Sequence, residues 1–598
     1  MKERHSYDMG LIGNCAYLAL IGKDTNIEWM CLPRFDSSFV FGGLVAGQKG
    51  GEFSIKPDSD DSSCEQSYIP NTNILRTQIT TNEGSYCVTD FAPRFMQNDR
   101  YYRPQMLIRK IEPLSGYPRV RVRCKPVGDY GAIIPEIERG SNHLRFSGLG
   151  EALRLTTDIP LNYILEESPF VLRQPCYMIL TYGVPLEGAL QETTNTFLNR
   201  TKTYWERWVK STSIGMLYQS EVIRSALALK ICQYEDTGAI IAAPTTSLPE
   251  FPNSTRNWDY RYCWMRDAYY TLNAFNNIGH FEEMEKYFAF ITNIPMPNGN
   301  RIQPLYSVTG NPALTEIELD IEGYLGNKPV RIGNDAYTHI QNDVYGQILL
   351  AILPLYLDER FRNHPGASDI NLVETVLEKI EMTIDEKDAG IWEFRSKAYR
   401  HAYSNLFQWA GSHAAMHIAK RLGKTELHKR AENLAKRAAQ HMENCFNPAL
   451  NAYTVGEGIG HMDASTLQMI IMGYIPHDSK LAADHLKALE KELKVGKGLF
   501  YRYSARDDFG LPESTFLICG FWYAEALACV GRIEESMEAF EELVGFSNHL
   551  GLLSEDVDAR DGSMWGNFPQ AYSHVGLVNA AARINNRLNK PSFLGLSD

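Results

Sequence analysis

The sequence predicts a multi-domain β + α chain in which an N-terminal antiparallel β-sandwich is followed by an (α/α)6 barrel. Its 598 residues, of which 44% are hydrophobic, are enough for two or more domains with a large core. Apolar residues alternate with period two in roughly the first 185 positions. After about residue 216 the pattern changes to the 3.6-residue period of helices.

Residues 1–185 read as the β-sandwich. Short segments rich in β-branched residues recur about every ten positions and are separated by turn residues; examples are 73–80, 85–91, 106–111, 119–123 and 176–182. Residues 186–215 are polar and look helical but carry no strong apolar stripe, so we assign them as a linker.

Residues 216–598 are assigned to the barrel because they contain twelve helix-like segments. These lie near 218–234, 264–278, 280–293, 341–358, 367–384, 403–422, 425–446, 464–473, 478–493, 513–531, 533–545 and 569–587. No sequence signature repeats at a fixed period, which favours a double ring of six hairpins over a solenoid.

Residues suited to chemistry precede every second helical segment. They are Trp264, Arg266 and Asp267, then Gln341 and Asp343, Glu393, His461 and Asp463, residues 506–513, and finally Glu555. If inner and outer helices alternate, these positions lie at one end of the barrel. We therefore expect them to converge on a single mouth.

Glu393 is the candidate general acid. It stands between Trp392 and Phe394, and partial desolvation by such neighbours helps a carboxyl to keep a proton near neutral pH. On this stretch alone, a buried structural glutamate is the commoner outcome. Glu555 is the candidate second carboxylate, although alone its acidic stretch would read as a solvated loop. Glycoside hydrolysis needs one protonated and one ionised carboxyl, so the presence of both Glu393 and Glu555 favours a catalytic role over the two structural readings.

The stretch 260–270 combines aromatic and ionic residues, as a sugar site requires. The alternative is that Asp267 caps a helix and pairs with Arg266. In the sandwich, the loop 29–37 carries Arg34 and Asp36. This loop is either simply salt-bridged or reaches into the site of the neighbouring domain.

Composition excludes several other classes. With 59 basic and 72 acidic residues the net charge is -13, which argues against nucleic acid or an anionic membrane as partner. The charged N-terminus is followed only by short apolar runs, so we expect a cytoplasmic protein. The 11 cysteines form no Cys-x-x-Cys pair, and nucleophile-elbow, zinc-helix and phosphate-loop motifs do not occur. We expect no metal and no cofactor.

Several spaced motifs together resemble glycoside hydrolase family 15, the glucoamylase-like enzymes. They are Cys31–Ser37, Trp264–Asp267, Val330–Asn334 with Asp343–Gly346, Gly390–Arg395, and Gly551–Glu555 with Gly566–His574. The resemblance runs in order over nearly the whole chain. It implies the sandwich and barrel named above and the release of glucose from α-glucosides by exo-acting, inverting hydrolysis.

The resemblance also implies a role for each matching residue. Glu393 would be the general acid and Glu555 the general base, and the implied sugar-binding residues are Trp264, Arg266, Asp267, Trp392, Arg34 and Asp36. The last two would close the site from the sandwich side. Asn405 stands where relatives carry a lysine, a departure that bears on the acceptor side of the site.

The expected substrate is a maltooligosaccharide or α-glucan. The alternatives are an α,α-trehalase of the same family and, more remotely, a sugar phosphorylase or a non-catalytic glucan-binding protein. The loops around 295–330 and 497–512 would decide the substrate, and one sequence does not reveal their preference.

Overall fold

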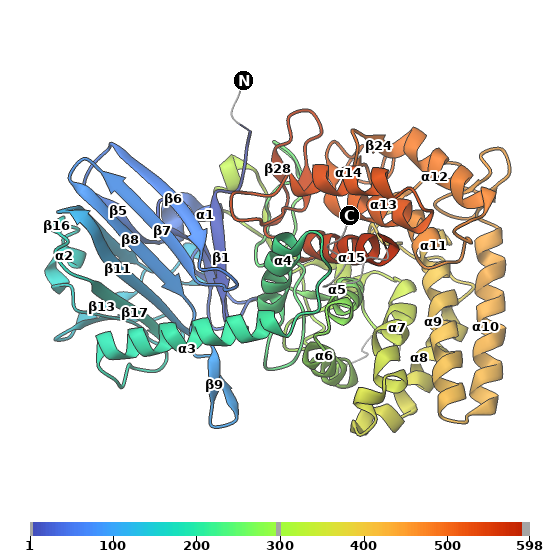
Figure 1. The fold of residues 1–598 in the computed structure, drawn as a ribbon, viewed down its shortest axis with the longest axis horizontal. Helices are drawn as coiled ribbons and strands as arrows, with labels where there is room; N and C mark the ends of the chain where they lie inside the picture. Colours follow the sequence, from blue (N-terminus) through green and yellow to red (C-terminus); the bar gives the residue numbers. More distant parts are fainter. Residues whose placement is uncertain (1–3, 295–300, 589–598) are drawn as a thin grey trace, which may run out of the picture.

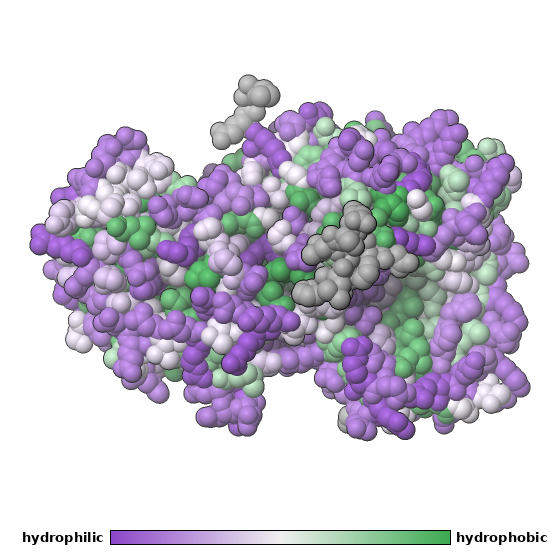
Figure 2. Space-filling model, in the orientation of Figure 1, coloured by the Kyte–Doolittle hydropathy of each residue, from purple (hydrophilic) through white to green (hydrophobic). Residues whose placement is uncertain are grey.

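The computed structural model describes residues 4–294 and 301–588, which form a β domain and a helical domain side by side (Figure 1). Hydrophilic side chains predominate over both domains on the face shown in Figure 2. Within the described residues no helix is long and apolar enough to cross a membrane. All eleven cysteines are free thiols.

The β domain is built around an eight-stranded antiparallel sheet, in the order β13-β14-β15-β17-β11-β8-β7-β6. Its strands are β6 (Ser62–Tyr68), β7 (Leu75–Thr81), β8 (Gly84–Phe91), β11 (Met106–Gly116), β13 (Glu136–Arg139), β14 (His143–Ser147), β15 (Leu153–Thr157) and β17 (Cys176–Tyr182). Along β7 every second residue is buried, because side chains alternate between the two faces of a strand.

Two smaller sheets complete the sandwich, which confirms the predicted architecture of this domain. They contain β5 (Glu52–Pro57), β12 (Arg119–Lys125) and β16 (Phe170–Val171), and β1 (Met9–Gly13), β2 (Leu18–Gly22), β3 (Ile27–Cys31) and β4 (Phe39–Phe41). Arg109 on β11 ties two sheets together. Its guanidinium pairs with Asp90 on β8 at 2.8 Å and donates to the Phe53 carbonyl on β5 at 2.7 Å.

Each of the twelve predicted helical segments coincides with one α-helix of the structure to within a few residues, and the predicted (α/α)6 barrel is confirmed. The helices are α4 (Gln219–Cys232), α5 (Met265–Asn277), α6 (Glu282–Asn293), α7 (Asp343–Leu357), α8 (Asn371–Thr383), α9 (Ala402–Arg421), α10 (Thr425–Glu443), α11 (Leu467–Ile471), α12 (Lys480–Leu493), α13 (Leu517–Cys529), α14 (Ile533–Val544) and α15 (Ala571–Leu588). The inner helix α13 is buried at every position, whereas the outer helix α14 buries only one face.

Most of the segment expected to be a linker is one long helix, α3 (Leu190–Lys210), which runs beside the sandwich towards the barrel (Figure 1). Its buried face consists of Thr194, Thr201, Trp205 and Val209. Two of these four residues are threonines, which explains why hydropathy alone showed no strong stripe.

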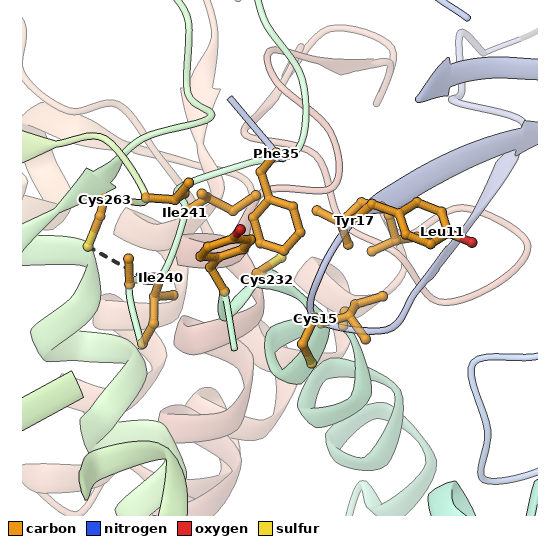
Figure 3. Packing of buried hydrophobic residues seen from close by; sticks show 14 of the residues in the cluster. Leu11, Cys15, Tyr17, Phe35, Cys232, Ile240, Ile241 and Cys263 are labelled. Atoms are coloured by element: carbon orange, nitrogen blue, oxygen red, sulfur yellow. Dashed lines mark hydrogen bonds between the residues drawn. The ribbon is translucent and has the colours of Figure 1, made fainter. Parts of the chain in front are cut away.

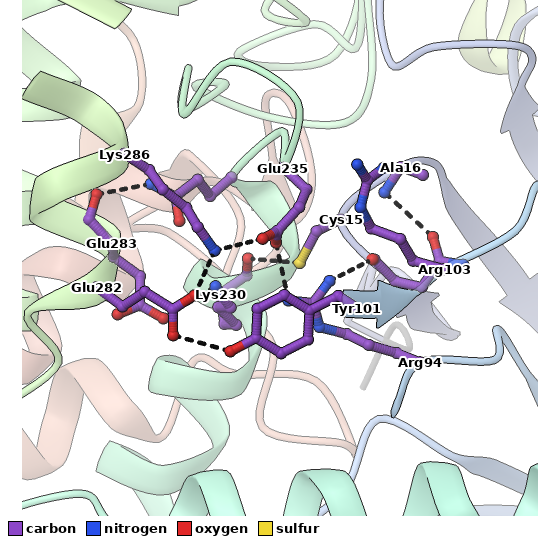
Figure 4. Close-up of polar contacts among 12 residues, drawn as sticks. Cys15, Ala16, Arg94, Tyr101, Arg103, Lys230, Glu235, Glu282, Glu283 and Lys286 are labelled. Carbon is purple, nitrogen blue, oxygen red and sulfur yellow. Dashed lines mark hydrogen bonds and ion pairs between the residues drawn. The ribbon is translucent and has the colours of Figure 1, made fainter. Parts of the chain in front are cut away.

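The two domains share one hydrophobic core where they meet. Tyr17 and Phe35 of the β domain belong to the same hydrophobic cluster as Cys232 and Ile241 at the start of the helical domain (Figure 3). A buried group of charged residues joins the same elements, with members from the β domain, α4 and α6 (Figure 4). This interdomain ion cluster consists of Arg94, Lys230, Glu235, Glu283 and Lys286.

Candidate active site

One cavity gathers residues that are almost three hundred positions apart in the chain. Its lining includes six of the eight predicted site residues, namely Trp264, Arg266, Asp267, Trp392, Glu393 and Glu555. They come from the connections that precede the inner helices α5, α9 and α15, so they lie at the same end of the barrel.

Glu393 sits on a tight turn before α9 with a left-handed backbone, φ +60°. A non-glycine residue in that region is held there by its surroundings at a cost of about 1 kcal/mol or more, which is common at functional sites. Its Oε1 accepts hydrogen bonds from Trp264 Nε1 at 2.7 Å and Gln341 Nε2 at 3.2 Å. Arg266 approaches the same oxygen at 3.5 Å, and the Glu393 side chain remains 22% exposed.

Glu555 lies just before the short strand β27 (Asp556–Val557), the central strand of a three-stranded sheet. Its side chain accepts hydrogen bonds from the Tyr260 hydroxyl at 2.7 Å and the Asn567 backbone N–H at 3.2 Å. The residue is only 1% exposed. Burial raises the pKa of Glu555 to about 7, with a further contribution from the charge of Glu250.

Tyr260 and Trp264 connect the two carboxyl groups. The Tyr260 hydroxyl binds Glu555, the Trp264 indole binds Glu393, and the two rings meet edge to face with centroids 5.5 Å apart. Glu393 and Glu555 are thus held as separate groups that line the same cavity. Tyr260 was not singled out from the sequence, although its place in an aromatic stretch four residues before Trp264 was a usable signal.

Arg266 and Asp267 occupy the first turn of α5 without capping it. The N-cap residue is Trp264, and its side chain makes no capping bond. Arg266 donates to the Ile391 carbonyl at 3.0 Å and lies 3.4 Å from Asp267. Among the described residues Asp267 Oδ2 has no hydrogen-bond donor, and burial raises the pKa of this carboxyl to about 6. This oxygen meets Arg266 Nη2 as an ion pair but accepts no hydrogen bond from the described residues, so it is suited to a substrate hydroxyl.

Trp392 is fixed by a hydrogen bond from its indole N–H to Asp463 Oδ2 at 2.8 Å. Asp463 is buried in the connection that precedes α11 and is not among the residues that line the cavity. This connection was also expected to reach the barrel mouth, but Asp463 lies behind the cavity wall. Its role is to orient an aromatic ring that lines the site.

A hairpin at 506–510 forms another wall of the cavity. Arg256 donates to Asp507 Oδ1 at 2.5 Å, and the Phe509 ring packs edge to face on Trp258 at 5.2 Å. Asp508 Oδ2 accepts the backbone N–H of Arg395 at 2.7 Å, which ties the hairpin to the turn of Glu393. The hairpin belongs to one of the two loops expected to influence the substrate. Residues 295–300 of the other loop lie outside the described residues.

Arg34 and Asp36, which the resemblance placed at the site, are not among the residues that line this cavity. They pair with each other at 3.0 Å. Their loop is held by Arg261, which donates to the Ser37 carbonyl at 2.6 Å, so it packs behind the site. Asn405 is buried in the first turn of α9 and is also absent from the cavity lining.

Two carboxyl groups and one guanidinium beside Glu555 were not recognised as parts of the site. They belong to Glu250, Asp556 and Arg502. In the described part of the chain, Glu250, Glu555 and Asp556 are the one group with the side-chain spacing of a metal site. Arg502 Nη2 lies 2.5 Å from Glu250, so a guanidinium already supplies positive charge there.

Comparison with known proteins places both domains of this chain in known families. The family model of the glycosyl hydrolases family 15 matches residues 217–582, and that of the trehalase-like N-terminal domain matches residues 3–160. A protein named trehalase from Thermoplasma volcanium is 34% identical over 97% of this chain and 94% of its own. Another from Mycolicibacterium smegmatis is 29% identical over 96% of this chain and 91% of its own.

A crystal structure of a bacterial glucoamylase complexed with acarbose has the same fold. Its TM-score is 0.68 at 15% identity, and the match covers 98% of this chain and 95% of that one. The family model spans more than half of the present sequence, and the T. volcanium relative aligns over nearly all of it. This chain therefore belongs to glycoside hydrolase family 15.

Proposed function

We propose that the protein is a trehalase that hydrolyses α,α-trehalose to two glucose molecules with inversion. The observation that carries this proposal is the alignment over both domains with relatives named trehalase, at up to 34% identity. The match of the β domain to the trehalase-like N-terminal model adds support. The relatives thus favour trehalose over the maltooligosaccharides that the sequence analysis put first.

In this proposal Glu393 delivers the proton to the glycosidic oxygen. The two hydrogen bonds that hold its carboxyl both end on Oε1. No donor within the described residues binds Oε2, which leaves that oxygen to carry the proton. The left-handed turn and the bond from Trp264 hold the group in a fixed direction, which general-acid catalysis requires.

Glu555 acts as the general base that takes a proton from the attacking water. An inverting enzyme places this water on the face of the sugar opposite the leaving group, so the base and the acid must be separate groups. The Tyr260 hydroxyl and the Asn567 N–H orient the carboxylate. Because the pKa of Glu555 is about 7, the base is ionised above that pH and protonated below it.

Arg266 and Asp267 hold hydroxyls of the glucose whose bond is cleaved. Both lie in the first turn of α5 beside Glu393. Asp267 Oδ2 is paired with Arg266 but accepts no hydrogen bond within the described residues, so it can take one from a sugar hydroxyl. The second glucose of trehalose faces the wall that contains Trp258 and Phe509, whose rings offer apolar surface to a sugar face.

The test is to follow the anomers of glucose by NMR during hydrolysis of trehalose, maltose, maltotetraose and isomaltose. Inversion of trehalose releases one α- and one β-glucose per bond. Glu393→Gln and Glu555→Gln should each lower kcat by on the order of 10³-fold, because each removes one proton-transfer group. Glu426→Gln, on the exposed side of α10, is the matched control and should leave kcat unchanged.

Two results would contradict the proposal. Release of two α-glucose molecules from trehalose would mean retention and would remove Glu555 from the role of base. A higher kcat/KM for maltotetraose than for trehalose would return the substrate to the maltooligosaccharides.

A further inference from the structure

Beside the candidate base Glu555, the protein buries two more carboxyl groups. Glu250 is 1% exposed and Asp556 is fully buried. Glu250, Asp556 and Glu555 each place one oxygen within 4.8 Å of the others. Glu250 lies in the loop after α4, more than three hundred residues before Glu555 in the sequence.

The positive charge in contact with these carboxyls comes from Arg502. Its Nη2 lies 2.5 Å from Glu250 and 3.5 Å from Asp556. Arg256 also acts on Glu250 through its charge, but its Nη2 is bonded to Asp507. With all three carboxyls ionised, the Arg502 group would carry two uncompensated negative charges. Like charges this close and this deeply buried do not all ionise.

The hydrogen bonds point to the place of the missing proton. Asp556 Oδ1 accepts from the Ser514 hydroxyl at 3.1 Å, but among the described residues Oδ2 has no partner. Glu250 Oε2 meets Arg502 Nη2 at 2.5 Å, and Oε1 has no hydrogen-bond donor among the described residues. A proton on one of the two carboxyls would remove a negative charge from the group and turn an acceptor oxygen that lacks a partner into a donor.

We propose that Glu250 and Asp556 hold one proton between them, so that with Arg502 they form a neutral unit and leave Glu555 free to act as the base. This inference rests on the proposed function for the role of Glu555. Glu250 and Asp556 would then be positioning residues that act through Glu555 and do not touch the substrate.

The remaining groups around the pair agree with this distribution of charge. The other titratable side chains that act on it are Tyr7, Tyr260 and Cys519, and burial raises the pKa of each well above its usual value, so all three are neutral. Burial likewise raises the pKa of Asp556 far above that of an exposed aspartate. Arg502 Nη2 lies 2.5 Å from Glu250 but 3.5 Å from Asp556, so Glu250 pairs with the guanidinium and Asp556 is the member that carries the proton.

A neutral unit predicts a non-additive response to substitution. Asp556→Asn replaces the neutral member. Glu250→Gln allows Asp556 to ionise against Arg502 instead. Either single variant keeps one negative charge next to the Arg502 guanidinium. The net charge of residues 250, 502 and 556, which acts on Glu555, therefore stays near zero. The double variant leaves Arg502 unopposed beside Glu555, and a nearby positive charge lowers the pKa of a carboxyl.

The experiment is the pH dependence of kcat/KM for trehalose in the wild type, both single variants and the double variant. The acidic limb reports the ionisation of the base in the free enzyme. The apparent pKa of this limb should change by less than about 0.5 unit in each single variant. In the double variant it should fall by about one unit or more. A shift of about a unit in each single variant would mean that both carboxyls are ionised. An unmoved limb in the double variant would mean that the pair does not act on Glu555.

An infrared difference spectrum between the wild type and Asp556→Asn at pH 7 tests the proton without relying on catalysis. The carbonyl band of a protonated carboxyl should be present in the wild type and lost in the variant. A difference spectrum in which no such band is lost from the wild type to Asp556→Asn would overturn the inference. If Glu555→Gln stayed active while this band was present, the assignment of the base would fail and the shared proton would stand.

Discussion

The protein contains two buried groups of charged residues that differ in their balance of charge. The interdomain ion cluster has three cations and two glutamates, and Lys286 also reaches the exposed Glu282 (Figure 4). The group beside the cavity has three carboxyls, of Glu250, Glu555 and Asp556, and Arg502 pairs with the first and the last of them. Both groups are removed from water to a similar degree.

The balance of charge, not burial, decides how these carboxyls titrate. Burial alone would raise the pKa of Glu283. The charge and hydrogen bond of Lys230 at 2.9 Å, together with smaller contributions from His280 and the backbone, outweigh burial, and the pKa falls to about 2. Glu555 is buried to the same degree, and its pKa rises to about 7. A balanced cluster therefore stays charged and serves as structure. An unbalanced one titrates near neutral pH, where a general base must exchange protons.

The largest effect on stability should come from breaking the balanced cluster. Glu283→Gln leaves the Lys230 ammonium buried without its partner, which should cost about 3–5 kcal/mol of unfolding free energy. Urea denaturation at pH 7 measures this loss. The control is Glu282→Gln, whose side chain is 48% exposed and which should cost less than about 1 kcal/mol. Equal losses in the two variants would mean that burial of the Lys230 pair adds nothing.

The same carboxyl should make stability depend on pH in the acid range. The folded pKa of Glu283 is depressed to about 2, so its contribution is fully present above the unfolded value of about 4.5. That contribution is lost as the pH falls from there towards 2. Wild type and Glu283→Gln should therefore converge in stability over this interval.

Displacing the base should reduce activity while the fold is kept. A Cβ on Gly566 would lie 2.5 Å from Glu555 Cβ, so Gly566→Ala should push Glu555 aside and lower kcat by roughly 10- to 100-fold. Gly531→Ala is the control, because Gly531 also has a positive φ but its Cβ would meet open space. A similar loss of activity in both variants would trace the effect to backbone strain instead of Glu555.

The raised pKa of Glu555 predicts that activity falls at acid pH. The pH profile of kcat/KM for the wild type measures this effect. Because the base must be ionised, kcat/KM should be full above pH 7 and fall about tenfold for each pH unit below it. A limb near pH 4.5 instead would mean that the base titrates like an exposed glutamate, and the contrast between the two clusters would be lost.

The sequence predicts those parts of the molecule that depend on local spacing. The twelve helices follow from apolar periodicity, and their alternation brings Glu393 and Glu555 to one end of the barrel. Glu250 is different, because its ion pair with Arg502 joins positions about 250 residues apart and nothing in its neighbourhood signals a site. Helix α3 was missed as a packed element because half of its buried stripe is threonine.

Arg34 tests the limit of inference from a motif. The motif implied that it closes the site, but it pairs with Asp36 in the loop behind the cavity, and its side chain is 41% exposed. Arg34→Ala should therefore change kcat/KM for trehalose by less than about twofold and stability by less than about 1 kcal/mol, as expected for an exposed ion pair. A tenfold loss of kcat/KM at unchanged Tm would place Arg34 at the substrate. In that case the loop would have to move on binding, and the sandwich would contribute directly to the site.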